Sequence, residues 1–93
     1  MKNGNYTVTQ SVIDTLEALP WDVEWHCYEF FSLCRKNLRL HNSPANPYDG
    51  TLQRAMRKFR HVYNVICVNS KKSIYVKESN EGQYKSEHNP IDN

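Results

Sequence analysis

The sequence contains few of the residues that build special frameworks, with three cysteines and three glycines among 93 residues. An odd number of cysteines without a Cys-x-x-Cys pair argues against a disulfide framework and against a cysteine-rich zinc site. We therefore expect Cys27, Cys34 and Cys67 to be reduced, small apolar side chains. The glycines are too few and too scattered to form a phosphate-binding loop.

Long hydrophobic runs are missing too. The apolar stretches are only a few residues long, whereas a membrane-spanning helix needs about 20. Residues 1–5 lack the apolar segment of a secretion signal. These absences favour a cytoplasmic protein without a membrane span.

Groupings typical of enzymes are not found. No Ser/His/Asp or Cys/His arrangement and no pair of carboxylates stands in a recognisable motif. Cys27, Cys34 and His41 recur at intervals of seven residues. In a helix that interval spans about 10.5 Å, which is too far for one metal ion to bridge. We expect no catalytic activity, no metal and no cofactor.

The net charge of +2 is small, but the charges are unevenly distributed, and each part of the chain has few charges of one sign. Residues 1–34 carry one lysine against five acidic residues, net −4. Residues 35–77 carry ten Lys and Arg against Asp49, net +9, and residues 78–93 carry Lys85 against four acids, net −3. A basic middle between acidic flanks indicates a surface for an anionic partner.

Apolar periodicity predicts two helices in the N-terminal half. Thr7-Val8-Thr9-Gln10 matches a capping box, and apolar residues at helical spacing follow it, so we expect a helix over 8–19 that ends before Pro20. Asp22 is expected to cap a second helix over 23–40. Apolar side chains of this second helix recur at spacings of three and four and supply much of the core.

Residues 41–50 contain two prolines and a glycine and predict a loop. A third helix is expected over about 50–62, beginning at Asp49 or Thr51. Its apolar face comprises Leu52, Ala55, Met56, Phe59 and Val62, and its opposite face is centred on Arg54, Arg57 and His61, with Gln53, Lys58 and Arg60 at the margins. One side of this helix therefore packs on the core, and the other is cationic.

From residue 62 onward, β-branched and aromatic residues dominate. Residues 62–68 and 74–76 predict two strands joined by a polar turn at 69–73. Residues 79–93 include a single aliphatic side chain and predict a disordered acidic tail. We expect an α+β fold, with a flexible N-terminus (1–6) and a domain over 7–78 that has three helices followed by a two-stranded hairpin.

This order of elements resembles a winged helix, with the hairpin as the wing. The stretch DGTLQRAMRKFR at 49–60 is similar to the recognition helices of winged helix-turn-helix regulators, in which a Thr opens the helix and an Arg-x-x-Arg pattern lies beside apolar positions. Lys72-Ser73-Ile74-Tyr75 looks like the second strand of the wing. The chain is also similar to small winged-helix proteins of phages and other mobile elements. The resemblance implies DNA binding, in transcription regulation or as a mobile-element accessory factor.

One feature departs from the helix-turn-helix pattern. About ten residues separate the second and third expected helices, whereas a compact helix-turn-helix uses a turn of three or four. This difference affects the angle at which the third helix would meet DNA.

Physical chemistry also favours duplex DNA as the partner. Affinity for DNA needs several cations on one surface, and base reading needs forked or amide donors on a helix that enters the major groove. We expect Gln53, Arg54 and Arg57 to read bases. The other expected contacts are with the backbone: Thr51 at the helix start, Lys58, His61, and Lys71 and Lys72 of the wing, with Arg35, Lys36, Arg39 and Arg60 as further candidates.

Other partners stay open. A winged helix that serves as an adaptor or inhibitor would place the same cationic helix against an acidic host protein, without sequence-specific DNA binding, and RNA is a third candidate. The aromatic residues of the second helix are expected in the core. Trp21 and Trp25 are expected to form an exposed pair that marks a dimer or partner surface. A minimal regulator of this kind usually acts as a dimer, so we also expect self-association or tandem binding, although no coiled-coil heptads specify it.

Overall fold

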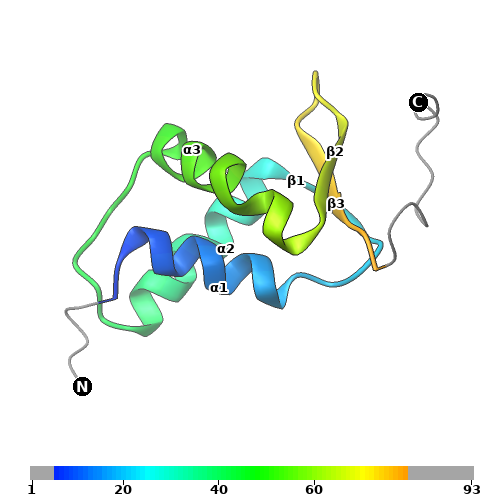
Figure 1. The fold of residues 1–93 in the computed structure, drawn as a ribbon. Coiled ribbons are helices and arrows are strands. Elements are labelled where there is room, and N and C mark those ends of the chain that lie inside the picture. The colour runs from blue at the N-terminus through cyan, green and yellow to red at the C-terminus, as the bar shows by residue number, and fades with distance from the viewer. Residues whose placement is uncertain (1–5, 80–93) are drawn as a thin grey trace.

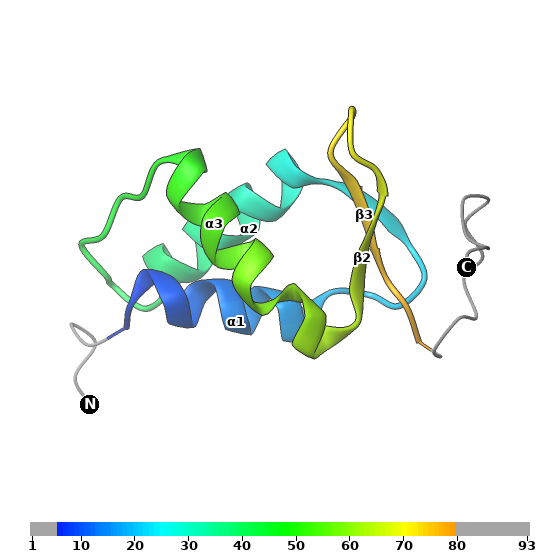
Figure 2. The ribbon, with the colours of Figure 1, turned by 45° about the horizontal axis from the view of Figure 1, so that its top comes forward.

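The computed structural model describes residues 6–79, which form an α+β fold (Figure 1). Within these residues, three α-helices pack together: α1 (Val8–Ala18), α2 (Cys27–Leu40) and α3 (Asp49–Phe59). A three-stranded antiparallel sheet is formed by β1 (Glu24–His26), β2 (Val65–Asn69) and β3 (Ile74–Lys77). A short 3-10 helix, η2 (Arg60–Tyr63), joins α3 to β2. The hairpin of β2 and β3 stands at one end of the helical layer, and its turn projects away from it (Figure 2).

The first helix begins where its sequence predicts. The Thr7 side chain accepts a hydrogen bond of 3.0 Å from the backbone N–H of Gln10, which satisfies one free donor of the first turn. The Gln10 side chain does not return to Thr7 but donates to Asp14 at 2.9 Å. Half of the expected capping box is therefore present.

The second helix starts four residues later than predicted, because Glu24–His26 form β1. The expected capping role of Asp22 is wrong: this residue has a φ of 59°, and its carboxylate accepts hydrogen bonds from Ser79. His26 caps α2 instead. Its ring nitrogen accepts from the Tyr28 N–H at 3.2 Å, and its own N–H donates to Glu29 at 3.1 Å, which completes a reciprocal capping box.

The third helix begins at Asp49, as expected, but ends at Phe59. The chain then tightens into η2 and reverses at Asn64, which has a left-handed φ of 59°. This change of helical pitch turns Val62 outward, where it is 71% exposed. Its predicted place on the apolar face is therefore wrong, and the first strand of the hairpin begins at Val65 rather than at residue 62.

The sheet contains one strand more than the predicted hairpin. Its strand order is β1-β3-β2, so β3 pairs with strands on both sides. Trp25 of β1 and Cys67 of β2 both lie opposite Tyr75 of β3, and a bulge interrupts the register between Cys67 and Asn69. The pairing of β1 with β3 ties the connection between α1 and α2 to the hairpin.

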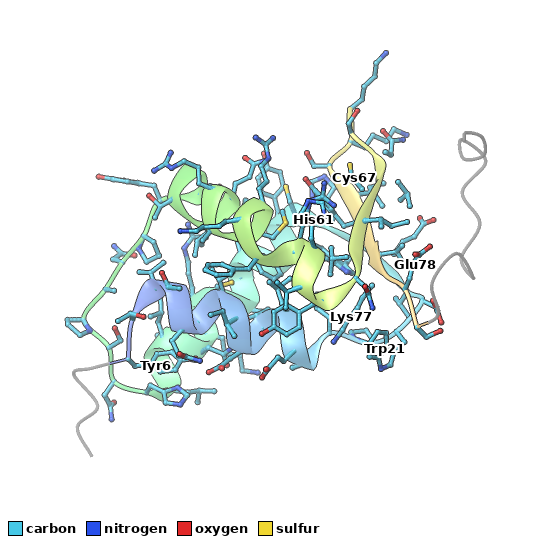
Figure 3. The ribbon with its side chains drawn as sticks, in the orientation of Figure 1. Tyr6, Trp21, His61, Cys67, Lys77 and Glu78 are labelled. Carbon is cyan, nitrogen blue, oxygen red and sulfur yellow. The ribbon has the colours of Figure 1, made fainter. Side chains whose placement is uncertain are left out.

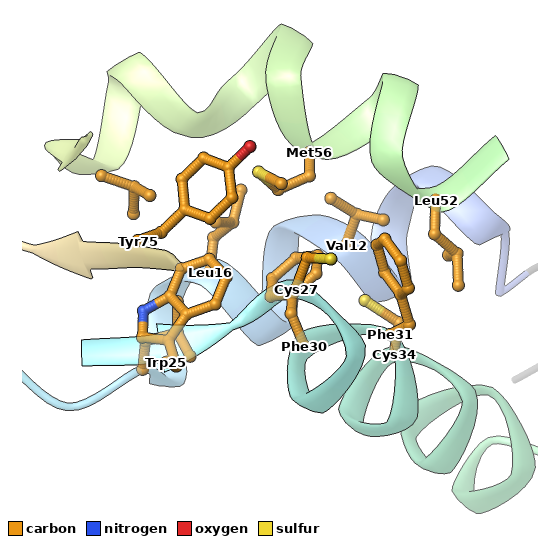
Figure 4. Packing of buried hydrophobic residues seen from close by; sticks show 12 residues of the cluster. Val12, Leu16, Trp25, Cys27, Phe30, Phe31, Cys34, Leu52, Met56 and Tyr75 are labelled. Atoms are coloured by element: carbon orange, nitrogen blue, oxygen red, sulfur yellow. The ribbon is translucent and has the colours of Figure 1, made fainter. Parts of the chain in front are cut away.

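The core lies between the three helices and the sheet (Figure 4). Its most deeply buried apolar side chains include Val12, Leu16, Phe30, Cys34, Leu52, Met56, Val65 and Val76. Trp25 extends this core toward the sheet, because its ring stacks on Phe30 at 5.3 Å and on Tyr75 at 5.2 Å. The aromatic contacts thus join α2 to β1 and β3.

Lys77 is a buried cation, only 3% exposed, and it closes the C-terminal end of α1. Its ammonium donates to the carbonyl oxygens of Leu16 at 2.9 Å and Glu17 at 2.8 Å and lies 4.4 Å from the centre of the Trp21 ring. The last turn of α1 holds no basic residue of its own, so β3 supplies the positive charge that suits the negative end of the helix dipole. Burial lowers the pKa of Lys77, and the nearby Glu17 carboxylate opposes this shift.

The first residue that packs on the domain is Tyr6, one residue before the predicted start of the domain at residue 7. Tyr6, expected in the flexible N-terminus, donates a hydrogen bond of 2.6 Å to Asp14 and stacks on His41 at 3.7 Å between ring centres. The predicted tail overlaps the described residues only at Ser79, which binds Asp22, and its remainder, residues 80–93, lies outside them.

The role of Lys77 in the fold is testable by replacement with an apolar side chain of similar length. Lys77→Met leaves the carbonyl oxygens at the end of α1 without their donor, so we expect the free energy of unfolding to fall by about 2–4 kcal/mol. Urea denaturation followed by circular dichroism measures this change. Lys72→Met, at the exposed hairpin turn, is the control and is expected to change stability by less than about 0.5 kcal/mol. Equal effects of the two replacements would contradict the role assigned to Lys77.

Candidate nucleic-acid interface

The outward side of α3 is cationic, as its sequence predicts. Arg54, Arg57 and Lys58 are exposed, and Gln53 is half-buried beside them. On the opposite side, Leu52 and Met56 are fully buried in the core and fix the rotation of the helix. The apolar face therefore decides which polar side chains α3 presents to solvent.

An open cleft lies between α3 and the hairpin. It has a volume of about 410 Å³ and is lined by Gln53, Arg57, Arg60, His61, Cys67, Ser70, Ser73 and Tyr75. Figure 3 labels His61, just after α3, and Cys67, on the hairpin. None of the described residues that line the cleft is acidic. Donor groups from two separate parts of the chain thus meet around one positively charged hollow.

The hairpin turn carries the two predicted lysines. Lys71 and Lys72 are both exposed, and the Lys72 N–H donates to the Asn69 side chain at 3.0 Å, which shapes the turn. Ser73 completes the reversal with a left-handed φ of 56°. The turn projects beyond α3, so these lysines lie at the far end of the hairpin that forms one wall of the cleft (Figure 1).

Four residues that line the cleft are missing from the sequence-based list: Cys67, Ser70, Ser73 and Tyr75. The signal that could have found them is the pairing of the two strands, because Cys67 and Tyr75 lie opposite each other in the register. Serines in a turn are usual on any surface, so their position beside α3 becomes visible only in the fold.

Arg60 contributes to the structure as well as to the cleft. It is half-buried, and its guanidinium donates to the Val65 carbonyl at 2.8 Å and lies 5.8 Å from the centre of the Tyr75 ring. These contacts hold the end of α3 against the hairpin. Part of its donor capacity is therefore used within the protein.

Arg35 is also engaged internally. Its guanidinium forms an ion pair of 2.6 Å with Asp49 and donates to the Pro47 carbonyl at 3.0 Å, which anchors the loop before α3. Asp49 places a carboxylate in the first turn of α3, close to Thr51. That negative charge weighs against a phosphate at this helix start, the position predicted for Thr51.

The two remaining cations of α2 lie apart from the cleft. Lys36 lines a separate hollow with residues of α1, and Arg39 is exposed near the C-terminal end of α2. Neither belongs to the residues that line the cleft between α3 and the hairpin. Together with the buried Lys77, these positions show that the +9 of residues 35–77 is not one continuous surface.

The predicted exposed pair of tryptophans does not form. Trp25 is only 7% exposed because it lies in the core between Phe30 and Tyr75, whereas Trp21 is 51% exposed. The expectation that aromatic residues of α2 are in the core holds for Phe30 and Phe31 but is wrong for Tyr28, which is 62% exposed.

The cysteines differ in their surroundings. Cys27 and Cys34 are buried and all three thiols are free, whereas Cys67 is half-buried at the cleft. Burial raises the pKa of Cys34 to about 11 and keeps its thiol protonated.

The chain has no detectable match among protein-family models, curated proteins or solved structures. None of the helices within residues 6–79 combines the length and the apolar character that crossing a bilayer requires.

Cys67 lines the cleft, so the reactivity of its thiol tests whether the cleft is open to solvent. Under native conditions we expect Cys67 to react with a thiol reagent at least about tenfold faster than Cys27 and Cys34, which become reactive only when the core opens. Thiol release with Ellman's reagent measures the rates. Cys67→Ser is expected to abolish the fast phase. A fast phase that persists in this variant would show that a core cysteine is accessible instead.

Proposed function

We propose that this protein is a winged-helix DNA-binding protein. The observation that carries the proposal is the positively charged cleft between α3 and the hairpin, to which Arg57 and Arg60 contribute their charges and His61 its imidazole ring. The three helices followed by a hairpin support the winged-helix assignment, with the turn at residues 69–73 as the wing.

In this proposal α3 enters the major groove. Arg54 and Arg57 are exposed on the outward side of the helix and carry forked donors suited to guanine, and Gln53 carries an amide suited to adenine. The Arg54 side chain lies over the start of the helix, because its Nη1 atom is 3.8 Å from the position that a Cβ would take at Gly50.

The hairpin holds the DNA backbone beside the groove. The cations Lys71 and Lys72 lie at the projecting turn, and the cation Lys58 is exposed in the second half of α3, with the His61 ring exposed just after that helix. These cations flank the base-reading side chains on both sides, so phosphates on either edge of the groove are within the reach of the surface. A small transcriptional regulator or a mobile-element accessory factor would use such a surface.

A salt titration tests the proposal. We expect the full chain to bind random-sequence duplex DNA with a Kd of about 1–100 µM at about 50 mM salt, and affinity to fall steeply as salt rises. Arg54→Ala with Arg57→Ala is expected to abolish binding, because it removes two exposed cations from the outward side of α3. Fluorescence anisotropy measures both. Arg39→Ala, which removes an exposed cation away from the cleft, is the control and is expected to retain binding. A wild-type chain that does not bind duplex DNA at about 50 mM salt would overturn the proposal.

The assigned division between base and backbone contacts is tested separately. Lys71→Ala with Lys72→Ala is expected to weaken binding to all sequences alike and to reduce the slope of log K against log salt by about 2. Gln53→Ala is expected to change the preferred sequence and leave this slope unchanged. Selection from a randomised duplex pool, followed by titration of the selected sites, measures both effects. A changed sequence preference in the lysine variant would reverse the assignment.

A further inference from the structure

A second surface, which is largely apolar, lies on α2. It is on a different side of this helix from Arg35 and from the residues that contact α3. Two hollows of about 590 Å³ and about 270 Å³ adjoin there, and both are lined by Leu19, Pro20 and Leu33. They share no residue with the cationic cleft. The connection between α1 and β1 forms one wall, and the side of α2 that carries Leu33 forms the other.

Large apolar side chains are exposed along this surface. Leu33 is 43% exposed, Val23 is 49% exposed, and Leu40, near the end of α2, is 66% exposed. Leu40 lines the smaller hollow and Val23 lines the larger one. A contiguous set of exposed leucine and valine side chains on a small protein marks a contact surface rather than ordinary solvent-facing residues.

Charges at the two ends of the surface have opposite signs. Glu24 and Glu29 line the larger hollow, around the start of α2, and Lys36 lines the smaller hollow, toward the end of that helix. In a helix, Glu29 precedes Leu33 by about 6 Å and Lys36 follows it by about 4.5 Å. If two such helices lie antiparallel and cross at Leu33, each Glu29 therefore meets the Lys36 of the other copy.

In the same antiparallel arrangement, Leu40 of one copy would meet the larger hollow of the other copy. It lies about 10.5 Å beyond Leu33 along the helix, so it would reach the level at which α2 begins in the other copy. There the larger hollow is lined by Val23, Trp25 and Phe30. The surface thus offers both a protruding apolar side chain and a hollow at the matching distance on the other side of Leu33.

We propose that a second copy of this chain binds here, through antiparallel packing of α2 on α2 about a two-fold axis at Leu33. Self-complementarity is what a two-fold interface requires, since each patch must match itself after rotation. The opposite charges at the two ends meet that requirement, whereas a uniformly acidic or basic partner would match only one end. The contact stands independently of DNA binding. One helix side and one connection form a small interface, so we expect a dissociation constant of about 10–100 µM.

Charge exchange gives the sharpest test. Lys36→Glu places two acidic residues together at each of the two symmetry-related contacts, and Glu29→Lys places two basic ones together there, so each variant alone is expected to self-associate at least about tenfold more weakly than the wild type. Mixed in equal amounts, the two variants carry complementary charges and are expected to form a heterodimer. Sedimentation equilibrium of the full chain, from about 5 to about 500 µM, measures the constants. Arg39→Glu reverses a charge on another side of α2 and is expected to leave dimerisation unchanged.

The mixture also protects the test against misfolding. Glu29 accepts a hydrogen bond from the N–H of His26, so Glu29→Lys weakens the helix cap as well as the interface. A merely unfolded variant would not regain association when mixed with Lys36→Glu. Leu33→Asp is expected to abolish dimerisation, and Val62→Asp, at an exposed apolar residue away from the hollows, is its control. A wild-type chain that is monomeric at about 500 µM would overturn the proposal, and so would a mixture that associates no better than its components although both variants have the circular-dichroism spectrum of the wild type.

Discussion

The antiparallel pairing of β1 with β3 is the contact on which the rest of the structure depends. It joins Glu24–His26, between the first two helices, to Ile74–Lys77, at the end of the hairpin. Trp25 and Tyr75 face each other in this pairing and stack, so that the sheet shares its core with α2. Because β3 is held in this way, β2 and the hairpin turn are fixed beside α3, and the cationic cleft acquires its second wall.

Much of the helical part of the fold could be predicted from local patterns. Thr7 and Gln10 mark the start of α1, and the apolar face of α3 follows from Leu52 and Met56. The strand β1 is not predictable from local patterns, because it has only three residues. Val23 and Cys27, each two residues from Trp25, continue the helical spacing across it. Its partner lies about 50 residues away, so no local pattern reveals that it is a strand.

The candidate site, like the fold, could be predicted only where it depends on local patterns. Gln53, Arg57 and His61 could be predicted because a helix face follows directly from residue spacing. The contributions of Ser70 and Ser73 depend on where the hairpin lies, which is decided by long-range pairing. The roles of Arg35 and Lys77 could not be read from composition, because a count of cations does not separate those that face solvent from those that hold the fold together. Arg35 anchors the loop before α3, and Lys77 closes α1.

The position of β3 has a consequence for synthesis of the protein. Helices α1, α2 and α3 form their backbone hydrogen bonds between residues that are close in sequence, whereas the sheet must wait for residues 74–77 and must close a loop of about 50 residues to reach β1. On the ribosome, α3 therefore leaves the exit tunnel before its neighbouring hairpin can form. The second wall of the cleft therefore forms only after the hairpin has paired with β1, so the hollow beside α3 is completed late in the assembly of the fold.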